Sequence, residues 1–249
     1  MSTFQIFNAA QIISLRTGGK ILRECLQKTA ERVKPGVTTQ ELDMFAEEFI
    51  LSHTGAIPAF KGYHGFPATL CISINDQCVH GIPGKRTVGE GDIVSLDGGV
   101  IYDRLYTDAC ITVPAGDVPA HVQRFLEISE DALESACGIV APGLKVGDIS
   151  SAIQKAVEKH GYSCVNGLTG HGLGTTLHQF PDIPNVGKAG TGPKLPVHTI
   201  IAIEPITAMG KPEIREEADG WTIATADGSL SAHFEHTILI TETGNEIIA

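Results

Sequence analysis

The sequence has few basic residues and no run of them. It contains 18 lysines and arginines against 29 aspartates and glutamates, which gives a formal net charge of -11. Proteins that bind nucleic acid need lysines and arginines clustered on one face, where they displace counterions from the phosphates. No such cluster is visible, so we expect no nucleic-acid partner.

Long hydrophobic runs and paired cysteines are also missing. No stretch approaches the roughly 20 apolar residues that a membrane-spanning helix needs, and amides interrupt the apolar segment 4–11, unlike a signal peptide. The cysteines form no C-x-x-C pair, which gives no support to a zinc ribbon or a thioredoxin-like motif; they stand at positions 25, 71, 78, 110, 137 and 164. Several lie in apolar runs, which is typical of reduced core residues. We expect a soluble, cytoplasmic protein without membrane contact.

The remaining composition is that of an ordinary globular protein. Hydrophobic residues make up 42% and charged residues 19% of the 249 residues. A chain of this length can bury one large core, either as one domain or as two packed halves. The choice between these depends on how the chain is organised internally.

A weak internal repeat indicates two similar halves. Pro35-Gly-Val37 opens a helical pattern, and Pro142-Gly-Leu144 opens another at an offset of 107 positions (142 − 35). The apolar positions of an amphipathic helix recur in both, at 42, 45, 46, 49 and 50 and at 149, 152, 153, 156 and 157. Similarity of this grade also arises by chance, but we favour a duplicated unit of two helices and a sheet.

Local signals support the helix starts in both halves. Thr38 with Glu41 resembles a capping box, and Asp148 can cap the corresponding helix of the second half. A further helix is expected before each, over roughly 8–33 and 118–140. We predict a single catalytic domain over residues 1–249, with approximate halves 8–115 and 116–249 and a shared cleft between their sheets.

Four acidic residues each stand at one end of an apolar, strand-like run, where a lone buried carboxylate is costly unless it is paired or binds a metal. They are Asp97 in 93–97, Asp108 in 107–112, Glu204 in 200–204 and Glu235 in 234–240. Few cations lie nearby, but His171 stands in the glycine-rich segment 170–174. Taken singly, each acid is better explained as a surface or turn residue. Together, four carboxylates and one imidazole suit two divalent cations that share bridging ligands.

An ordered set of motifs resembles the type I methionine aminopeptidases, which have the pita-bread fold. The set runs from about residue 8 to the C-terminus and includes segments 63–67, 71–76, 80–83, 170–174, 178–181, 203–205 and 234–237, besides the pair Asp97 and Asp108. A glycine-flanked histidine alone would be a weak signal, whereas the ordered set is specific. Only 26 positions separate His178 from Glu204 (204 − 178), too few for the helical insertion of type II enzymes.

The resemblance implies a fold and a set of metal ligands. The fold is α+β, with two pseudo-symmetric halves that place antiparallel sheet inside and helices outside. The implied ligands of two divalent ions (Co, Mn, Fe or Zn) are Asp97, Asp108, His171, Glu204 and Glu235, with Asp108 and Glu235 as the bridging carboxylates. The sequence does not choose among these metals.

The resemblance also implies catalytic residues. His178 would donate a hydrogen bond to the oxygen of the scissile carbonyl, and His80 would bond the scissile amide nitrogen. Glu204 would carry the proton from the attacking water to the leaving amine. A substrate α-amino group bound to one ion would restrict cleavage to the first residue. Without the resemblance, each histidine would be interpreted as an ordinary loop or turn residue.

The implied methionine pocket departs from the usual pattern at two positions. Phe60 stands where the family commonly has cysteine, and Leu177 where it commonly has phenylalanine, so bulk is gained at one place and lost at the other. His233, where the family often has glutamine, shares a strand face with Glu235. The complete set of implied substrate-binding residues is Phe60, Tyr63, His64, Phe66, Cys71, Leu177 and Trp221.

The function implied by this resemblance is removal of the N-terminal methionine from peptides and nascent chains with a small second residue. The ribosome is a candidate place of action, and we expect a monomer. Two alternatives stay open: a related peptidase that cleaves Xaa-Pro bonds, and a non-catalytic protein that binds peptides in the same cleft. The first usually carries an additional N-terminal domain, and the second usually lacks some of the metal ligands.

Overall fold

Two helix pairs with the same internal spacing cover the molecule. The computed structural model describes residues 3–249. The first pair is α1 (Ala9–Ala30) and α2 (Thr39–Leu51), and the second is α3 (Ala120–Cys137) and α4 (Val146–Glu158). The offset of 107 positions between the two Pro-Gly segments recurs in the helices. It separates the starts of α2 and α4 (146 − 39), their ends (158 − 51), and the ends of α1 and α3 (137 − 30). The four predicted helices are therefore confirmed, while the division into halves at residue 115 stays a prediction.

The helix caps follow the predicted chemistry. Thr38 and Glu41 form a capping box, in which Thr38 N–H donates to Glu41 Oε2 (2.8 Å) and Glu41 N–H donates to Thr38 Oγ1 (3.2 Å). Asp148 Oδ2 accepts the backbone N–H of Lys145 (3.1 Å) at the equivalent place in α4.

The helices α1 and α3 each end slightly earlier than predicted, at Ala30 rather than 33 and at Cys137 rather than 140. Beyond these residues the backbone continues through i→i−3 turns, with Val33 N–H bonded to Ala30 O (3.0 Å) and Val140 N–H bonded to Cys137 O (3.1 Å). These tighter turns redirect the chain before each Pro-Gly segment. The apolar periodicity continues through them, which explains why the sequence overestimates both helices.

The first half is built on a long antiparallel hairpin. Strands β4 (Ile93–Tyr102) and β5 (Leu105–Pro114) pair over their full length, and β1 (Ala56–Pro58) and β2 (Leu70–Ile74) flank β4. Their buried, β-branched residues suit a sheet that is covered on one face. Helices α1 and α2 provide that cover, with α1 packed on β4 and β5 and α2 on β1 and β2. Leu22 of α1, Leu42 and Ile50 of α2, and Leu96 and Val100 of β4 belong to one buried cluster.

The second half contains a five-stranded antiparallel sheet in the order β15-β14-β9-β7-β8. Its strands are β7 (Thr169–Gly172), β8 (Gln179–Pro184), β9 (Ile200–Ile203), β14 (His236–Ile240) and β15 (Asn245–Ile247). Strand β9 begins 107 positions after β4 (200 − 93), the same offset that relates the two helix pairs. It is therefore the counterpart of β4 in the second half. Its core includes Phe125, Leu133, Ile149, Ile201 and Ile238.

Two small sheets complete the molecule. They are β6 (Ser163–Cys164), β10 (Ile206–Ala208) and β13 (Ser231–His233) in one, and β3 (Gln77–Val79), β11 (Ile214–Glu216) and β12 (Ile223–Thr225) in the other. A short 3-10 helix, η1, covers Tyr63–Gly65. Because β3 belongs to the first half and β11 and β12 to the second, one small sheet joins the halves.

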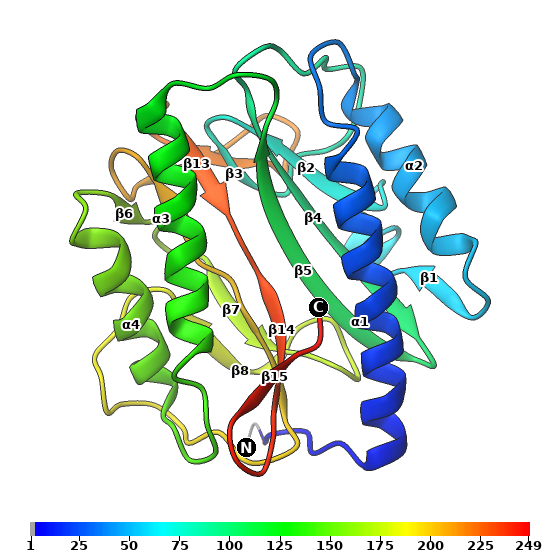
Figure 1. The fold of residues 1–249 in the computed structure, drawn as a ribbon, viewed down its shortest axis with the longest axis vertical. Helices are drawn as coiled ribbons and strands as arrows, with labels where there is room; N and C mark the ends of the chain where they lie inside the picture. Colours follow the sequence, from blue (N-terminus) through cyan, green and yellow to red (C-terminus); the bar gives the residue numbers. More distant parts are fainter. Residues whose placement is uncertain (1–2) are drawn as a thin grey trace.

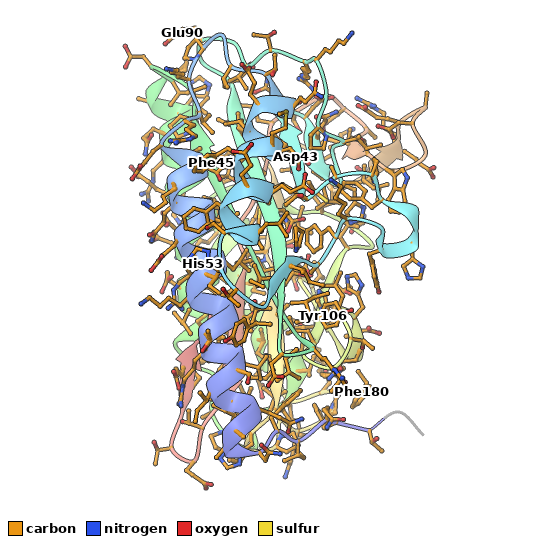
Figure 2. All side chains as sticks on the ribbon, turned by 90° about the vertical axis from the view of Figure 1, so that its right-hand side faces the viewer. Asp43, Phe45, His53, Glu90, Tyr106 and Phe180 are labelled. Atoms are coloured by element: carbon orange, nitrogen blue, oxygen red, sulfur yellow. The ribbon has the colours of Figure 1, made fainter. Side chains whose placement is uncertain are left out.

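The two helix pairs cover one side of the sheets and leave the other side open. Figure 1 shows α1 with α2 and α3 with α4 as two pairs, with β4, β5 and β14 running between them. In Figure 2, turned by 90°, α1 and α2 lie on one side of the first sheet, and Tyr106 and Phe180 lie on the other. The open face of the sheets is therefore the place where a cavity can form.

Two sequence expectations about the chain as a whole can be compared with the structure. No helix within residues 3–249 is both long enough and apolar enough to span a membrane. All six cysteines are free and buried, as expected for reduced core residues. Burial raises the pKa of Cys25 and of Cys137 to about 12, which keeps these thiols protonated at neutral pH.

Candidate metal centre

Strand pairing places the two aspartates on one face of the first sheet. Asp97 lies opposite Cys110, and Asp108 lies opposite Gly99 across the β4–β5 ladder. Residues opposite each other, and residues two apart on one strand, point to the same face. Asp97 and Asp108 therefore project together from the open face, in the middle of their strands rather than at the ends.

The two glutamates occupy the corresponding place in the second sheet. His236 pairs with Ile203 between β14 and β9, so the same antiparallel register places Glu235 opposite Glu204, each one residue beyond its strand. The connection between the glutamates (235 − 204) is longer than that between the aspartates (108 − 97), because it holds β10 to β13. Glu204 still follows Asp97 at the offset that relates the two halves (204 − 97).

Hydrogen bonds between β5 and the start of β14 hold the two halves together at this point. Glu235 N–H donates to Cys110 O (2.9 Å), and Asp108 N–H donates to Thr237 Oγ1 (2.9 Å). The Thr237 hydroxyl in turn donates to Asp108 O (2.6 Å). The backbones that carry Asp108 and Glu235 are therefore fixed relative to each other before any ligand binds.

His171 brings a nitrogen atom to these carboxylates. It lies in β7, next to Gly172, which pairs with Ile201 of β9. Its Nε2 is 3.5 Å from Glu204 Oε1 and 3.8 Å from Asp108 Oδ2. Ligand atoms of Asp108, His171 and Glu235 all lie within 4.8 Å of one another. Asp97 and Glu204 line the same cavity.

Burial makes this carboxylate cluster costly in the absence of a cation. Asp97 is 8%, Asp108 4% and Glu235 2% exposed. Burial, followed by repulsion from neighbouring carboxylates, raises the pKa of Asp108, Glu204 and Glu235 well above the usual range, and burial raises that of Asp97 to about 7. Burial, followed by the nearby His178, lowers the pKa of His171 to about 3, so its ring is neutral at neutral pH.

The donor atoms of the cluster fit divalent cations. Asp108 Oδ1 and Glu235 Oε1 are buried without any hydrogen-bond partner, which is unusual unless an ion satisfies them. Nδ1 of His171 lies 3.0 Å from the carbonyl oxygen of Gly172. When Nδ1 donates there, the lone pair of Nε2 is free for a metal, as is usual for metal-binding histidines.

His80 and His178 lie at the mouth of the cavity and are exposed, unlike the acidic residues. The Tyr63 hydroxyl is 3.1 Å from Nδ1 of His178, and the rings of His171 and His178 are 4.3 Å apart between centroids. His80 follows β3 with φ at 60°, in the left-handed region that residues other than glycine rarely adopt. This backbone conformation keeps His80 at the cavity although β3 ends at Val79.

An apolar wall faces the acidic cluster across the same cavity, whose volume is about 210 Å³. Phe60, Phe66, Cys71 and Leu177 are buried in one cluster, and Tyr63 and Trp221 pack against it. The rings of Phe66 and Trp221 meet edge to face, 5.2 Å apart. His64 is exposed at the rim, with its ring 4.4 Å from that of Tyr63. The structure therefore brings every predicted site residue to one cavity.

Two residues that the sequence analysis did not predict also contribute. Val79 lines the cavity beside His80. Asp43 of α2 accepts the backbone N–H groups of Thr69 (2.9 Å) and Leu70 (2.8 Å), and so holds the start of the strand that carries Cys71. Figure 2 shows Asp43 pointing from α2 toward the first sheet. Asp43 could have been noticed in the sequence, because it is an acidic residue next to the apolar positions of a predicted helix.

A cavity with carboxylate oxygens and an imidazole nitrogen at its base, between two helix-covered antiparallel sheets, is the kind of site that metal-dependent hydrolases use. Residues 14–242 match metallopeptidase family M24. The chain belongs to that family.

Individual relatives agree with the family match. A methionine aminopeptidase of Clostridium perfringens is 44% identical over 241 residues, 97% of this chain and 96% of that protein. Crystal structures of methionine aminopeptidases from Rickettsia prowazekii (41% identity, TM-score 0.96) and Thermotoga maritima (38% identity, TM-score 0.97) each cover 99% of both chains. The predicted pita-bread fold and the prediction of a metal-dependent peptidase are therefore confirmed. Membership of family M24 also implies the use of divalent metal.

Proposed function

We propose that this chain removes the N-terminal methionine from peptides and nascent proteins whose second residue is small. One observation carries the proposal: a single cavity of about 210 Å³ is lined by both a buried carboxylate–imidazole cluster and an apolar wall. The relatives that match over the full chain length carry the same activity in their names.

The acidic cluster would hold two divalent ions. Asp97, Asp108, His171, Glu204 and Glu235 would supply the ligands, with Asp108 and Glu235 as the proposed shared carboxylates. Ligand atoms of Asp108, His171 and Glu235 all lie within 4.8 Å of one another, which supports a common site. When bound, the ions lower the pKa of a water molecule and polarise the scissile carbonyl. Carboxylate oxygens with one imidazole are typical ligands of Mn, Fe or Co. Structural zinc sites differ, because they are rich in cysteine sulfur.

His178 would stabilise the carbonyl oxygen as it gains charge. When the Tyr63 hydroxyl donates to Nδ1 of His178 across 3.1 Å, the imidazole must carry its own proton on Nε2. That N–H can then donate to the substrate. Tyr63 therefore acts as a positioning residue that selects the useful tautomer of the ring.

Glu204 and His80 complete the proposed set. The side chain of Glu204 is 12% exposed, more than that of Glu235 (3%), and it lines the cavity. Glu204 would therefore be accessible for proton transfer from water to the leaving amine. His80 stands at the mouth, where it can hydrogen-bond the amide nitrogen of the scissile bond. Asn185 supports Glu204 by donating from its amide to the Glu204 carbonyl oxygen (2.9 Å).

The wall fits a flexible apolar side chain. Aromatic rings and the Cys71 sulfur suit the polarizable thioether of methionine. A cavity of about 210 Å³ is smaller than the roughly 300–1,000 Å³ of typical ligand pockets, so it accommodates one terminal residue rather than an extended peptide. Bulk at Phe60 and loss of bulk at Leu177 would give the pocket a different shape at a similar volume.

The setting of this activity completes the proposal. Substrates would be free peptide N-termini and nascent chains, with the ribosome as a candidate place of action. A monomer in the cytoplasm is the arrangement we propose, since the cavity is complete within one chain.

The decisive test compares substrates on the metal-loaded chain. With Mn, Fe or Co supplied, we expect release of methionine from Met-Ala and Met-Gly peptides and none from Met-Leu, whose second residue is large. A matched Ala-Pro peptide tests the Xaa-Pro alternative, which predicts the opposite preference. Absence of all peptidase activity with every one of these metals would support the peptide-binding alternative instead.

A further inference from the structure

His233 is a buried histidine with no hydrogen-bond partner at either ring nitrogen. It is 2% exposed, and both Nδ1 and Nε2 are buried and unsatisfied. Buried polar groups in folded proteins are almost always hydrogen-bonded, so an exception calls for another kind of partner, such as an ion. A purely structural role in the core would leave both nitrogens without a partner.

The backbone of His233 is fixed firmly although its ring is not. His233 N–H donates to Thr112 Oγ1 (3.0 Å), and the Thr112 hydroxyl donates to His233 O (2.6 Å). Thr112 lies on β5, the strand that also carries Asp108. The ring therefore projects into the cavity from a backbone tied to the strand that supplies a candidate metal ligand.

The position of the His233 ring reproduces that of His171. Nε2 of His233 is 3.7 Å from Glu204 Oε2 and 3.7 Å from Glu235 Oε2. Nε2 of His171 is 3.5 Å and 3.8 Å from its two carboxylate oxygens, one of them the other oxygen of Glu204. The Glu204 carboxylate is thus flanked by an imidazole on each side.

These distances favour a shared ion over a direct hydrogen bond. Donor–acceptor distances of hydrogen bonds are about 2.7–3.2 Å, shorter than those between His233 and the two carboxylates. Two atoms that are each about 2.1 Å from one metal ion can lie up to about 4.2 Å apart, which includes the observed 3.7 Å. We propose that His233 is a second imidazole ligand of the metal centre, on the side of Glu204 and Glu235.

This inference rests on the metal centre of the proposed function, and Co²⁺ can test the two separately. A bound imidazole keeps a proton on its other nitrogen, so each Co²⁺-bound histidine gives one strongly shifted, solvent-exchangeable proton resonance. Saturating the full-length apo chain with Co²⁺ should give two such resonances. His171→Gln should remove one and His233→Gln the other, while exposed His121→Gln should leave both.

Metal affinity gives a second measurement. In calorimetric titration with Co²⁺, His233→Gln should weaken the affinity for one ion by at least about tenfold, and His121→Gln should not change it. One resonance in the unaltered chain, removed by His171→Gln, would overturn the role of His233 and leave the proposed metal centre intact. Co²⁺ binding without any shifted imidazole resonance would overturn both. The resonance count in the unaltered chain decides the question even if a variant does not fold.

Discussion

The base and the wall of the cavity are built in different ways. The base, formed by Asp97, Asp108, His171, Glu204 and Glu235, comes from paired strands of both halves or from the residues that adjoin them. Most of the wall comes from connecting segments, because Phe60 follows β1, Leu177 lies between β7 and β8, and Trp221 lies between β11 and β12. Loops tolerate changes that strand ladders do not. Chemistry and side-chain preference can therefore vary separately in this fold.

The two regions also bury different groups. The base buries carboxylates, two of which have an oxygen without a hydrogen-bond partner, whereas the wall buries rings and aliphatic chains that need none. The base is thus stabilised by what it binds, and the wall by its own packing. Changes in the base should affect metal content and rate together, whereas changes in the wall should leave the metal content unchanged.

The largest effect is expected at the base, from Asp108→Ala. If Asp108 bridges two ions as proposed, its loss should abolish loading of two ions and lower kcat/KM by roughly 10³-fold or more, since metal ions supply several kcal/mol of transition-state stabilisation. Metal content per chain, measured after dialysis, checks the first part. Exposed Glu130→Ala on α3 is the matched control and should retain both ions. Two tightly bound ions in Asp108→Ala would refute the bridging role.

Next in size is the effect of His178→Ala at the mouth. Removing a donor to the developing oxyanion should lower kcat by roughly 10²- to 10³-fold while metal content stays unchanged. Steady-state kinetics on Met-Ala and metal analysis of the same preparation measure both. Exposed His121→Ala serves as the control. A loss of metal in His178→Ala would instead place this histidine in the base.

The sequence predicts the base better than the wall, for a physical reason. A buried carboxylate in an apolar strand is costly, so Asp97 and Asp108 stand out once the sequence offers Glu204, Glu235 and His171 in matching positions. Phe60 and Leu177 carry no such signal, since an apolar residue in a loop is ordinary. Their assignment required the family resemblance.

Features that depend on pairing between distant segments were beyond the sequence. The bond from Asp43 to the start of β2 and the Thr237 link to Asp108 each join segments far apart in the sequence. The ends of α1 and α3 were placed too late because the apolar pattern continues into the turns after Ala30 and Cys137. Local periodicity cannot distinguish an α-helical turn from a tighter one.

A moderate effect is expected in the wall, where Phe60 and Leu177 belong to one packed cluster. Leu177→Phe should narrow the pocket and lower kcat/KM for Met-Ala by about tenfold, and adding Phe60→Cys should restore most of it, because residues in contact couple by about 0.5–3 kcal/mol. Metal content should stay unchanged in both single variants and in the double variant. Additive losses in the double variant would show that the two positions do not share the pocket.

The smallest effect is expected from Tyr63→Phe, which keeps the ring in the wall but removes the hydroxyl that lies 3.1 Å from Nδ1 of His178. A hydrogen bond of this kind contributes about 0.5–1.5 kcal/mol, so kcat should fall by roughly 2- to 10-fold. KM should change little because the aromatic ring still packs against the substrate side chain. The same substitution in a His178→Ala background should have no further effect on kcat, since the hydroxyl then has no imidazole to orient. A fall in kcat of the same size in that background would show that Tyr63 acts on the substrate directly and so belongs to the wall alone.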